Sequence, residues 1–202
     1  MKRLSIILVA LLVLLLSACQ NDQSKSNVIF ASELNDKENI ILTTVSEQSF
    51  VFDYQIDTEY SEVIVWIEKY QSGELQDDKI GYISTEPAED SGTIILTTSK
   101  EMNQEKQQTY YIGIGDEGKT ASTSIVLDQK SNTDHFSMVS GQIVEEKALD
   151  DEKENVLATI AYSDNEYGVS SISSDFYEDP ETHLDELKEY DEVYLFKAKF
   201  VE

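Results

Sequence analysis

The sequence is short of cysteine and histidine, and each shortage excludes a class of protein. Cys19 is the only cysteine among 202 residues, so no disulfide framework can form within one chain. The two histidines cannot form a zinc site with the help of cysteine, since one thiol is too few for the usual ligand sets. A catalytic or metal-binding thiol elsewhere in the chain is excluded for the same reason.

Positive charge is also scarce. The chain has 15 Lys and Arg against 40 Asp and Glu, a formal net charge of −25, and Arg3 is its only arginine. A nucleic-acid-binding protein needs clustered Lys and Arg to neutralise phosphates, so nucleic acid is excluded as a partner. The acidity is compatible with cationic partners or divalent ions. Alternatively, it only keeps an exposed protein soluble.

Long hydrophobic runs are limited to the N-terminus, which has the layout of a secretory signal. Lys2 and Arg3 form a short positive region, and eleven consecutive apolar residues, 6–16, follow them. A run of this length is too short to span a hydrocarbon core of about 30 Å. The charge, the apolar run and the small residues after it indicate an exported protein.

The end of this leader, Leu16-Ser17-Ala18-Cys19, resembles the lipobox of bacterial lipoproteins. The resemblance implies diacylglyceryl transfer to the Cys19 thiol, removal of residues 1–18 as a signal peptide, and a palmitate-type lipid anchor. Two acyl chains give stable membrane anchoring, whereas a single acyl chain gives only marginal anchoring. The expected location is the extracytoplasmic face of a bacterial cell membrane. The alternative is an ordinary secretory signal with an incidental cysteine.

The remainder predicts a mainly β fold. Residues 19–37 are expected to be the lipidated cysteine and a flexible tether, and residues 38–128 a β-sandwich domain with turn-like segments between short strands. With a lone tryptophan, Trp66, on a central strand, the predicted sandwich resembles immunoglobulin-like or fibronectin type III-like architecture. Trp66 is expected in the sandwich core. Phe50, Phe52, Tyr54 and Ile56 share one apolar face by alternation. The seven predicted strands are 40–45, 50–57, 63–67, 79–83, 93–98, 109–115 and 120–127.

The C-terminal part of the sequence predicts a different mixture of elements from that of the sandwich domain. Residues 129–135 are predicted to be a linker, and residues 136–202 a small α+β region, packed on the sandwich or continuous with it. Asp179 followed by Pro180 indicates the start of one short helix. The predicted strands are 136–144, 156–162 and 192–201, the last with Tyr194, Phe196, Ala198 and Phe200 facing the core and Lys197 and Lys199 facing out.

Residues 113–120, GIGDEGKT, match the phosphate-binding pattern G-x-x-x-x-G-K-[ST]. A working loop needs a helix directly after the Lys-Thr pair, because the helix N-terminus holds the phosphates. Here β-branched residues follow, and Asp116 and Glu117 would point negative charge at a triphosphate. We interpret the segment as a β-hairpin turn and expect no nucleotide and no cofactor.

No motif predicts a catalytic or metal site. His183 lies near Asp179 and Asp185 and could join a carboxylate metal site, although a solvated helix histidine is the simpler interpretation. The acidic stretch 175–192 could attract Ca²⁺ but has no D-x-[DN]-x-[DN]-G loop. So many carboxylates could also supply a glycosidase-like pair.

The most distinctive segment is 163–179, which carries Tyr167, Phe176 and Tyr177 among small polar and acidic residues. Loops of this length are often functional, so these aromatics are the candidate ligand-binding residues. Alternatively, they only cap a small second core. The leading hypothesis is a non-enzymatic cell-surface binding or accessory module with a cationic or polyhydroxylated partner. An envelope hydrolase and a structural protein without a ligand are the alternatives.

Overall fold

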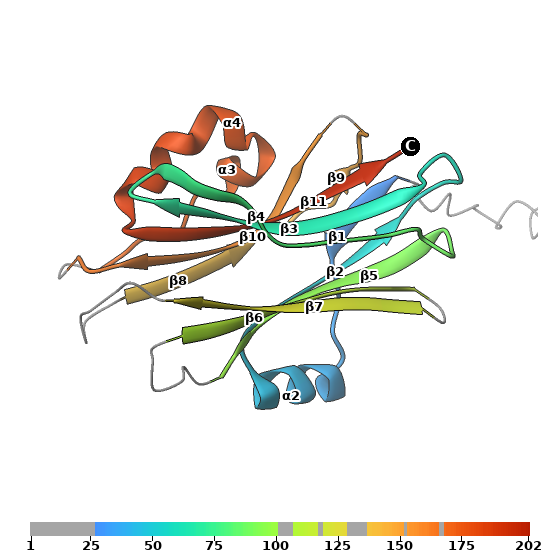
Figure 1. Cartoon of the computed structure of the whole chain (residues 1–202), viewed down its shortest axis with the longest axis horizontal. Coiled ribbons are helices and arrows are strands. Elements are labelled where there is room, and N and C mark those ends of the chain that lie inside the picture. The colour runs from blue at the N-terminus through green and yellow to red at the C-terminus, as the bar shows by residue number, and fades with distance from the viewer. Residues whose placement is uncertain (1–26, 101–106, 117–118, 129–136, 152, 166–167) are drawn as a thin grey trace, which may run out of the picture.

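The computed structural model describes residues 27–100, 107–116, 119–128, 137–151, 153–165 and 168–202. Within these residues, two antiparallel sheets pack as a β-sandwich, as Figure 1 shows. The prediction of a mainly β sandwich is therefore confirmed. Among the same residues, no helix is both long and apolar enough to cross a membrane.

The first sheet has six strands in the order β7-β6-β5-β2-β1-β9. They are β1 (Val28–Ala31), β2 (Ser46–Gln55), β5 (Ser91–Ser99), β6 (Gln107–Asp116), β7 (Lys119–Asp128) and β9 (Lys147–Ala148). The second sheet has five strands in the order β4-β3-β11-β10-β8. They are β3 (Glu62–Gln71), β4 (Glu74–Thr85), β8 (Ser137–Gln142), β10 (Asn155–Ser163) and β11 (Glu192–Val201).

Alternating apolar residues build the core between the sheets. Phe50 and Tyr54 project from β2 of the first sheet, and Phe196 and Phe200 project from β11 of the second; all four are buried. Ring centroids are 5.8 Å apart for Phe50 and Phe196, and 5.3 Å apart for Tyr54 and Phe200. The inward faces predicted for both strands are confirmed. The residues that alternate with these on β2 consequently face away from the second sheet.

The C-terminal region is continuous with the sandwich, the second of the two arrangements expected from the sequence. β11 pairs with β3 from Glu192↔Gln71 to Val201↔Glu62, and β10 and β8 extend the same sheet. Strands from residues 38–128 and from residues 137–202 therefore share one sheet, and the predicted linker 129–135 lies outside the described residues. A central strand has neighbours on both sides and both faces covered, which suits the unbroken apolar run 193–196.

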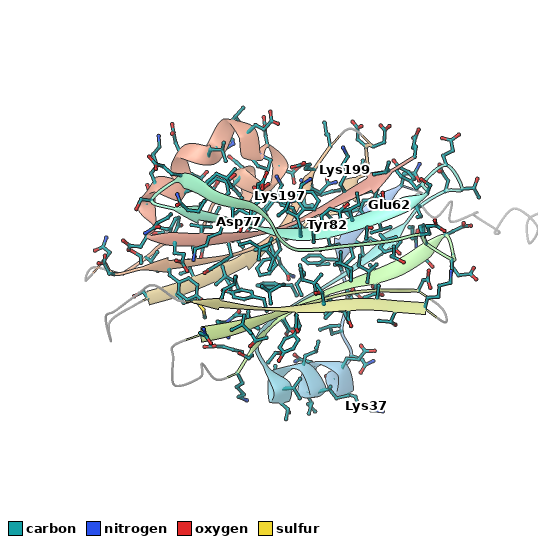
Figure 2. The ribbon with its side chains drawn as sticks, in the orientation of Figure 1. Lys37, Glu62, Asp77, Tyr82, Lys197 and Lys199 are labelled. Carbon is teal, nitrogen blue, oxygen red and sulfur yellow. The ribbon has the colours of Figure 1, made fainter. Side chains whose placement is uncertain are left out.

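The strand predicted at 40–45 is wrong, because residues Asp36–Val45 form a helix, α2. The Asn35 side chain accepts hydrogen bonds from the amides of Lys37 and Glu38, and the Glu38 carboxylate accepts one from the Asn35 amide. This reciprocal capping box starts the helix despite its β-branched residues. α2 lies on the outer side of the first sheet, with Lys37 turned away from the sheet, as Figure 2 shows.

The predicted tether 19–37 also ends earlier than expected. Val28–Ala31 form β1, which pairs with β2 on one side and with β9 on the other. The strand has only four residues, and β9 only two, so neither carries a long enough pattern to be predicted alone. Tertiary pairing, rather than local propensity, fixes both strands.

Short helical segments lie over one end of the second sheet, on its outer side (Figure 1). They are α3 (Ser174–Glu178), α4 (Pro180–His183) and the 3₁₀ helix η1 (Leu184–Glu189). Pro180 lies in the first turn of α4, as predicted, but the Asp179 side chain makes no capping hydrogen bond.

Trp66 is buried as predicted, with 3% of its surface exposed, but it does not lie between the sheets. Its neighbours Val65 and Ile67 belong to the core cluster between the sheets, whereas Trp66 projects to the opposite face of β3. There the Lys197 ammonium lies 5.5 Å from the indole centroid. Lys197 and Lys199 lie on the outer side of this sheet in Figure 2.

Candidate ligand groove

One row of paired residues crosses the outer face of the first sheet. Phe30 pairs with Asp53, and Asp53 pairs with Thr93. Thr93 pairs with Gly115, and Gly115 pairs with Thr120. These residues come from five strands, and the apolar residues that alternate with them in β2, β5 and β6 are buried: Phe52, Tyr54, Ile94 and Ile114. The row therefore faces solvent.

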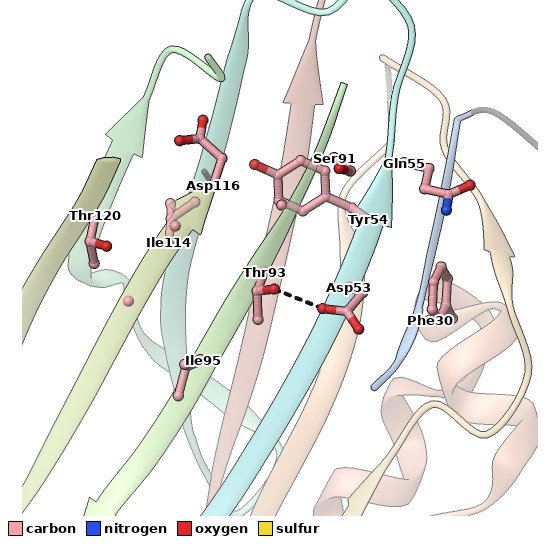
Figure 3. Close-up of a pocket in the computed structure, with 13 residues that line it drawn as sticks. Phe30, Asp53, Tyr54, Gln55, Ser91, Thr93, Ile95, Ile114, Asp116 and Thr120 are labelled. Atoms are coloured by element: carbon pink, nitrogen blue, oxygen red, sulfur yellow. Dashed lines mark hydrogen bonds between the residues drawn. The ribbon is translucent and has the colours of Figure 1, made fainter. Parts of the chain in front are cut away.

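This row lies in a surface groove of about 550 Å³, shown in Figure 3. Phe30 stands at one end of the groove and Thr120 at the other, with Asp53 and Thr93 between them. Small-molecule sites commonly have volumes of roughly 300 to 1,000 Å³. The groove is thus large enough for a ligand of a few rings.

Gly113 and Gly115 leave the middle of the groove without side chains. The pairing of β6 with β5 and β7 continues through both glycines without a bulge, and neither glycine has a positive φ. A Cβ placed on Gly113 would meet only the Ala121 carbonyl oxygen, at 4.0 Å. Glycine weakens a strand, and neither backbone geometry nor crowding requires it at 113. A glycine at such a position often marks a place where a ligand or another backbone approaches closely.

Tyr54 lies beneath the groove with an unsatisfied hydroxyl. Its side chain is 1% exposed, and the hydroxyl has no hydrogen-bond partner among the described residues. Burial, and secondly the charge of Asp116, raises the pKa of Tyr54 to about 12, so the phenol keeps its proton at neutral pH. A Cβ on Gly92 would lie 2.3 Å from this hydroxyl. An unpaired buried hydroxyl costs about 1–3 kcal/mol. Because the Tyr54 ring packs between the sheets, this hydroxyl lies on the core side of the sheet rather than in the groove.

The two carboxylates of the groove are both oriented by hydrogen bonds. Asp53 Oδ1 accepts one from the Thr93 hydroxyl at 2.7 Å, and Asp116 Oδ2 accepts one from the Ala88 amide at 2.6 Å. None of the described residues that line the groove is Lys, Arg or His; Lys119 lines a neighbouring hollow instead. The groove therefore disfavours anions and favours ligands that donate hydrogen bonds.

The groove continues beneath α2. A second hollow of about 390 Å³ shares Asp53, Thr93 and Ile95 with the groove. α2 has no buried residue: Leu42 is half-buried, and Ile40, Ile41 and Val45 are exposed. The wall that α2 and the residues before it contribute has three apolar residues, Leu34, Ile41 and Leu42, and three polar ones, Ser32, Glu33 and Glu38.

The aromatic residues proposed from the sequence lie elsewhere. Phe176 and Tyr177 belong to α3 and are 0% and 5% exposed. The Tyr177 hydroxyl lies 2.8 Å from the Thr159 hydroxyl of β10. Neither aromatic offers an exposed surface, which agrees with the alternative that they cap a small core against the second sheet. Tyr167 and Cys19 lie outside the described residues.

The histidine and acidic candidates are not gathered into a metal centre among the described residues, where no group of three or more His, Cys, Asp or Glu could hold an ion. His183 is half-buried, and its Nδ1 lies 3.0 Å from the Asp179 carbonyl oxygen. His135 lies outside the described residues.

The segment 113–120 is part of a β-hairpin, as interpreted from the sequence. Asp116 ends β6 and pairs with Lys119, which begins β7, so a strand follows the Lys-Thr pair where a phosphate-binding loop needs a helix. The segment nevertheless contributes Gly113, Gly115 and Thr120 to the groove. Sequence reasoning missed this role, although two glycines on one face of a strand were the available signal.

Fold and groove together define an antiparallel β-sandwich with an open site on one outer face. The chain belongs to the YgaN domain family, whose model matches residues 28–200. No curated protein and no solved structure matches it. The sequence alone pointed to no named family for the globular part, and this is corrected, because the family model covers nearly the whole folded part.

Proposed function

We propose that the protein is a membrane-anchored, non-enzymatic binding module that takes a polyhydroxylated ligand in the groove of its first sheet. The observation that carries the proposal is the open floor at Gly113, where a side chain would meet nothing closer than 4.0 Å. The anchor rests on the lipobox that ends at Cys19.

The polar groups of the groove favour hydroxyl-rich ligands over cationic ones. Gln55, Ser91, Thr93 and Thr120 are neutral groups that both donate and accept, as sugar hydroxyls do. Asp53 is the only carboxylate of the row, and one of its oxygens already accepts from Thr93. A basic peptide would require several open carboxylates.

Hydrolysis is a weaker proposal. A glycosidase needs two carboxyls that flank one bond, roughly 5 to 10 Å apart. Asp53 and Asp116 line the same groove, but Figure 3 places Thr93 and the Tyr54 ring between them. One Asp116 oxygen is bonded to the Ala88 amide, and the other is buried without a partner among the described residues. Asp116 is therefore poorly placed to transfer a proton to a ligand in the groove.

The anchor is tested by Cys19→Ala. Without the thiol no diacylglyceryl group can be attached, so we expect the precursor to remain uncleaved or the protein to be released. Labelling with palmitate followed by membrane fractionation measures both the lipid attachment and the location of the protein. Equal labelling of the variant and the wild type would contradict a lipid anchor at this residue.

The groove is tested by Gly113→Val. Valine favours a strand and meets open space here, so stability is expected to stay equal or rise by up to about 1 kcal/mol. Its side chain fills the floor, so ligand binding should be lost. The measurement is an NMR titration of residues 20–202, which keep every described strand, with maltotriose, cellotriose and chitotriose. At least one trisaccharide should shift the amides of Thr93 and Gly115.

Ser124→Val is the matched control. Ser124 is exposed on β7 and pairs with Tyr111, on the same outer face but outside the groove. It should bind as the wild type does. If no trisaccharide shifts the groove amides, or if Gly113→Val binds as well as Ser124→Val, the proposed site is wrong.

A further inference from the structure

The groove and the hollow beneath α2 form one surface that is polar at one end and apolar at the other. We infer that its ligand is an amphiphile: a neutral saccharide joined to an alkyl chain. The inference rests on the proposed function, because the saccharide part occupies the floor at Gly113. It adds a second, apolar subsite along α2.

The two subsites meet without a barrier. Asp53, Thr93 and Ile95 line both the groove and the hollow, so a ligand that passes Thr93 reaches Ile95 directly. Ile95 is 39% exposed and pairs with Val51 of β2, which makes this part of the sheet apolar. Beyond it lies Ile41, which is 51% exposed. An alkyl chain that starts at the sugar can therefore follow an apolar path.

The apolar wall is preformed rather than collapsed onto the sheet. The capping box of Asn35 and Glu38 fixes the start of α2. At its end, the Ser46 hydroxyl donates to the Leu42 carbonyl at 2.6 Å, and the Lys100 ammonium donates to the Thr43 carbonyl at 3.1 Å. An isolated helix of ten residues is marginal in water, so these end contacts hold α2 in place while Ile40, Ile41 and Val45 stay exposed.

The experiment compares glycosides that differ only in their alkyl chain. Residues 20–202 are titrated with methyl and octyl glycosides of glucose, galactose and N-acetylglucosamine, with the octyl compounds below their micelle concentrations. For at least one sugar, the octyl glycoside should bind at least about tenfold more tightly, the factor that the burial of two methylenes supplies. Equal affinity of every octyl and methyl pair would overturn the inference.

Ile41→Asp and Ile40→Asp form a matched pair. Both residues are exposed on α2, but only Ile41 lines the hollow. Ile41→Asp should remove the octyl advantage and leave methyl glycoside affinity unchanged, whereas Ile40→Asp should bind both as the wild type does. If both variants behave alike, the inference is wrong. If instead Gly113→Val leaves methyl glycoside binding unchanged, the proposed function itself fails.

Two other occupants of the α2 face give different results. If α2 instead contacts the bilayer, residues 20–202 would bind phosphatidylcholine vesicles without glycolipid, and both isoleucine variants would lose that binding. If a second copy covers it, sedimentation would show a dimer that Ile41→Asp dissociates. Either result, without an octyl advantage, would overturn the amphiphile inference.

Discussion

Replacing Phe196 with alanine is expected to lower the free energy of unfolding by about 3 to 5 kcal/mol. Phe196 is 1% exposed and projects from β11 into the space between the sheets. Its ring centroid lies 5.8 Å from that of Phe50 and 6.1 Å from that of Tyr110, and both partners belong to the first sheet. The truncation removes a contact that joins the sheets and leaves a cavity, so it combines a transfer cost with a packing cost.

Urea unfolding followed by the fluorescence of Trp66, the only tryptophan, measures this loss. Val126→Ala is the control, because Val126 is 54% exposed on β7 and its truncation should change stability by less than about 0.5 kcal/mol. The urea slope should stay the same in both variants. A Phe196→Ala loss as small as that of Val126→Ala would place Phe196 outside the core and reverse the faces assigned to β11.

Strands with a long alternating pattern were predictable from the sequence. β2 buries Phe50, Phe52 and Tyr54 as alternation requires, and six of the seven strands predicted between 40 and 127 correspond to β2 to β7. Alternation works there because one face of each strand meets the opposite sheet. Trp66 shows the limit of this reasoning. β3 is covered on both faces, so the pattern does not tell which face lies between the sheets.

α2 was mispredicted because two local signals conflict. Ile40, Ile41 and Val45 favour a strand, whereas the spacing of Asn35 and Glu38 is that of a capping box. The capping box outweighs the strand propensity here. Because α2 buries no side chain, packing gives these residues no stabilisation as a strand.

The groove could not be predicted because it depends on register between distant strands. Phe30 and Thr120 lie ninety positions apart in the chain and share a row only because four strand pairs align. The order of these strands is set by the whole sheet. The glycines at 113 and 115 are visible in the sequence. However, they also belong to a match to a nucleotide-binding pattern, which concerns the turn after them and not the sheet face that they leave open.

Lys197 is the site of the second large expected effect. Its ammonium lies 2.8 Å from Glu68 Oε1 and also pairs with Glu154. The Lys197 and Glu68 side chains are only 13% and 9% exposed. Glu68 Oε2 accepts a hydrogen bond from the Tyr70 hydroxyl at 3.0 Å, so the carboxylate is held in place from both sides. The Trp66 ring lies against the same ammonium.

Lys197→Met keeps the apolar stem and removes only the charge. The variant leaves the Glu68 carboxylate buried without its cation, so we expect a loss of about 3 to 5 kcal/mol at neutral pH. A second substitution, Glu68→Gln, removes the uncompensated charge and should restore part of the loss. Lys188→Met is the control, because its ion pair with Asp185 is exposed and its loss should have no measurable effect.

The pH dependence gives an independent check on Lys197→Met. Burial alone would lower the pKa of Lys197, but hydrogen bonds to Glu154 and Glu68 and their charges raise it above its ordinary value of 10.5. A raised pKa means that the stabilisation by Lys197 is complete below 10.5 and is lost as the pH rises through the pKa of the folded state. The difference in unfolding free energy between wild type and variant should therefore be constant near neutrality and shrink in strong alkali. A difference that grows with alkaline pH would show that Lys197 is not stabilised as a cation in the folded protein.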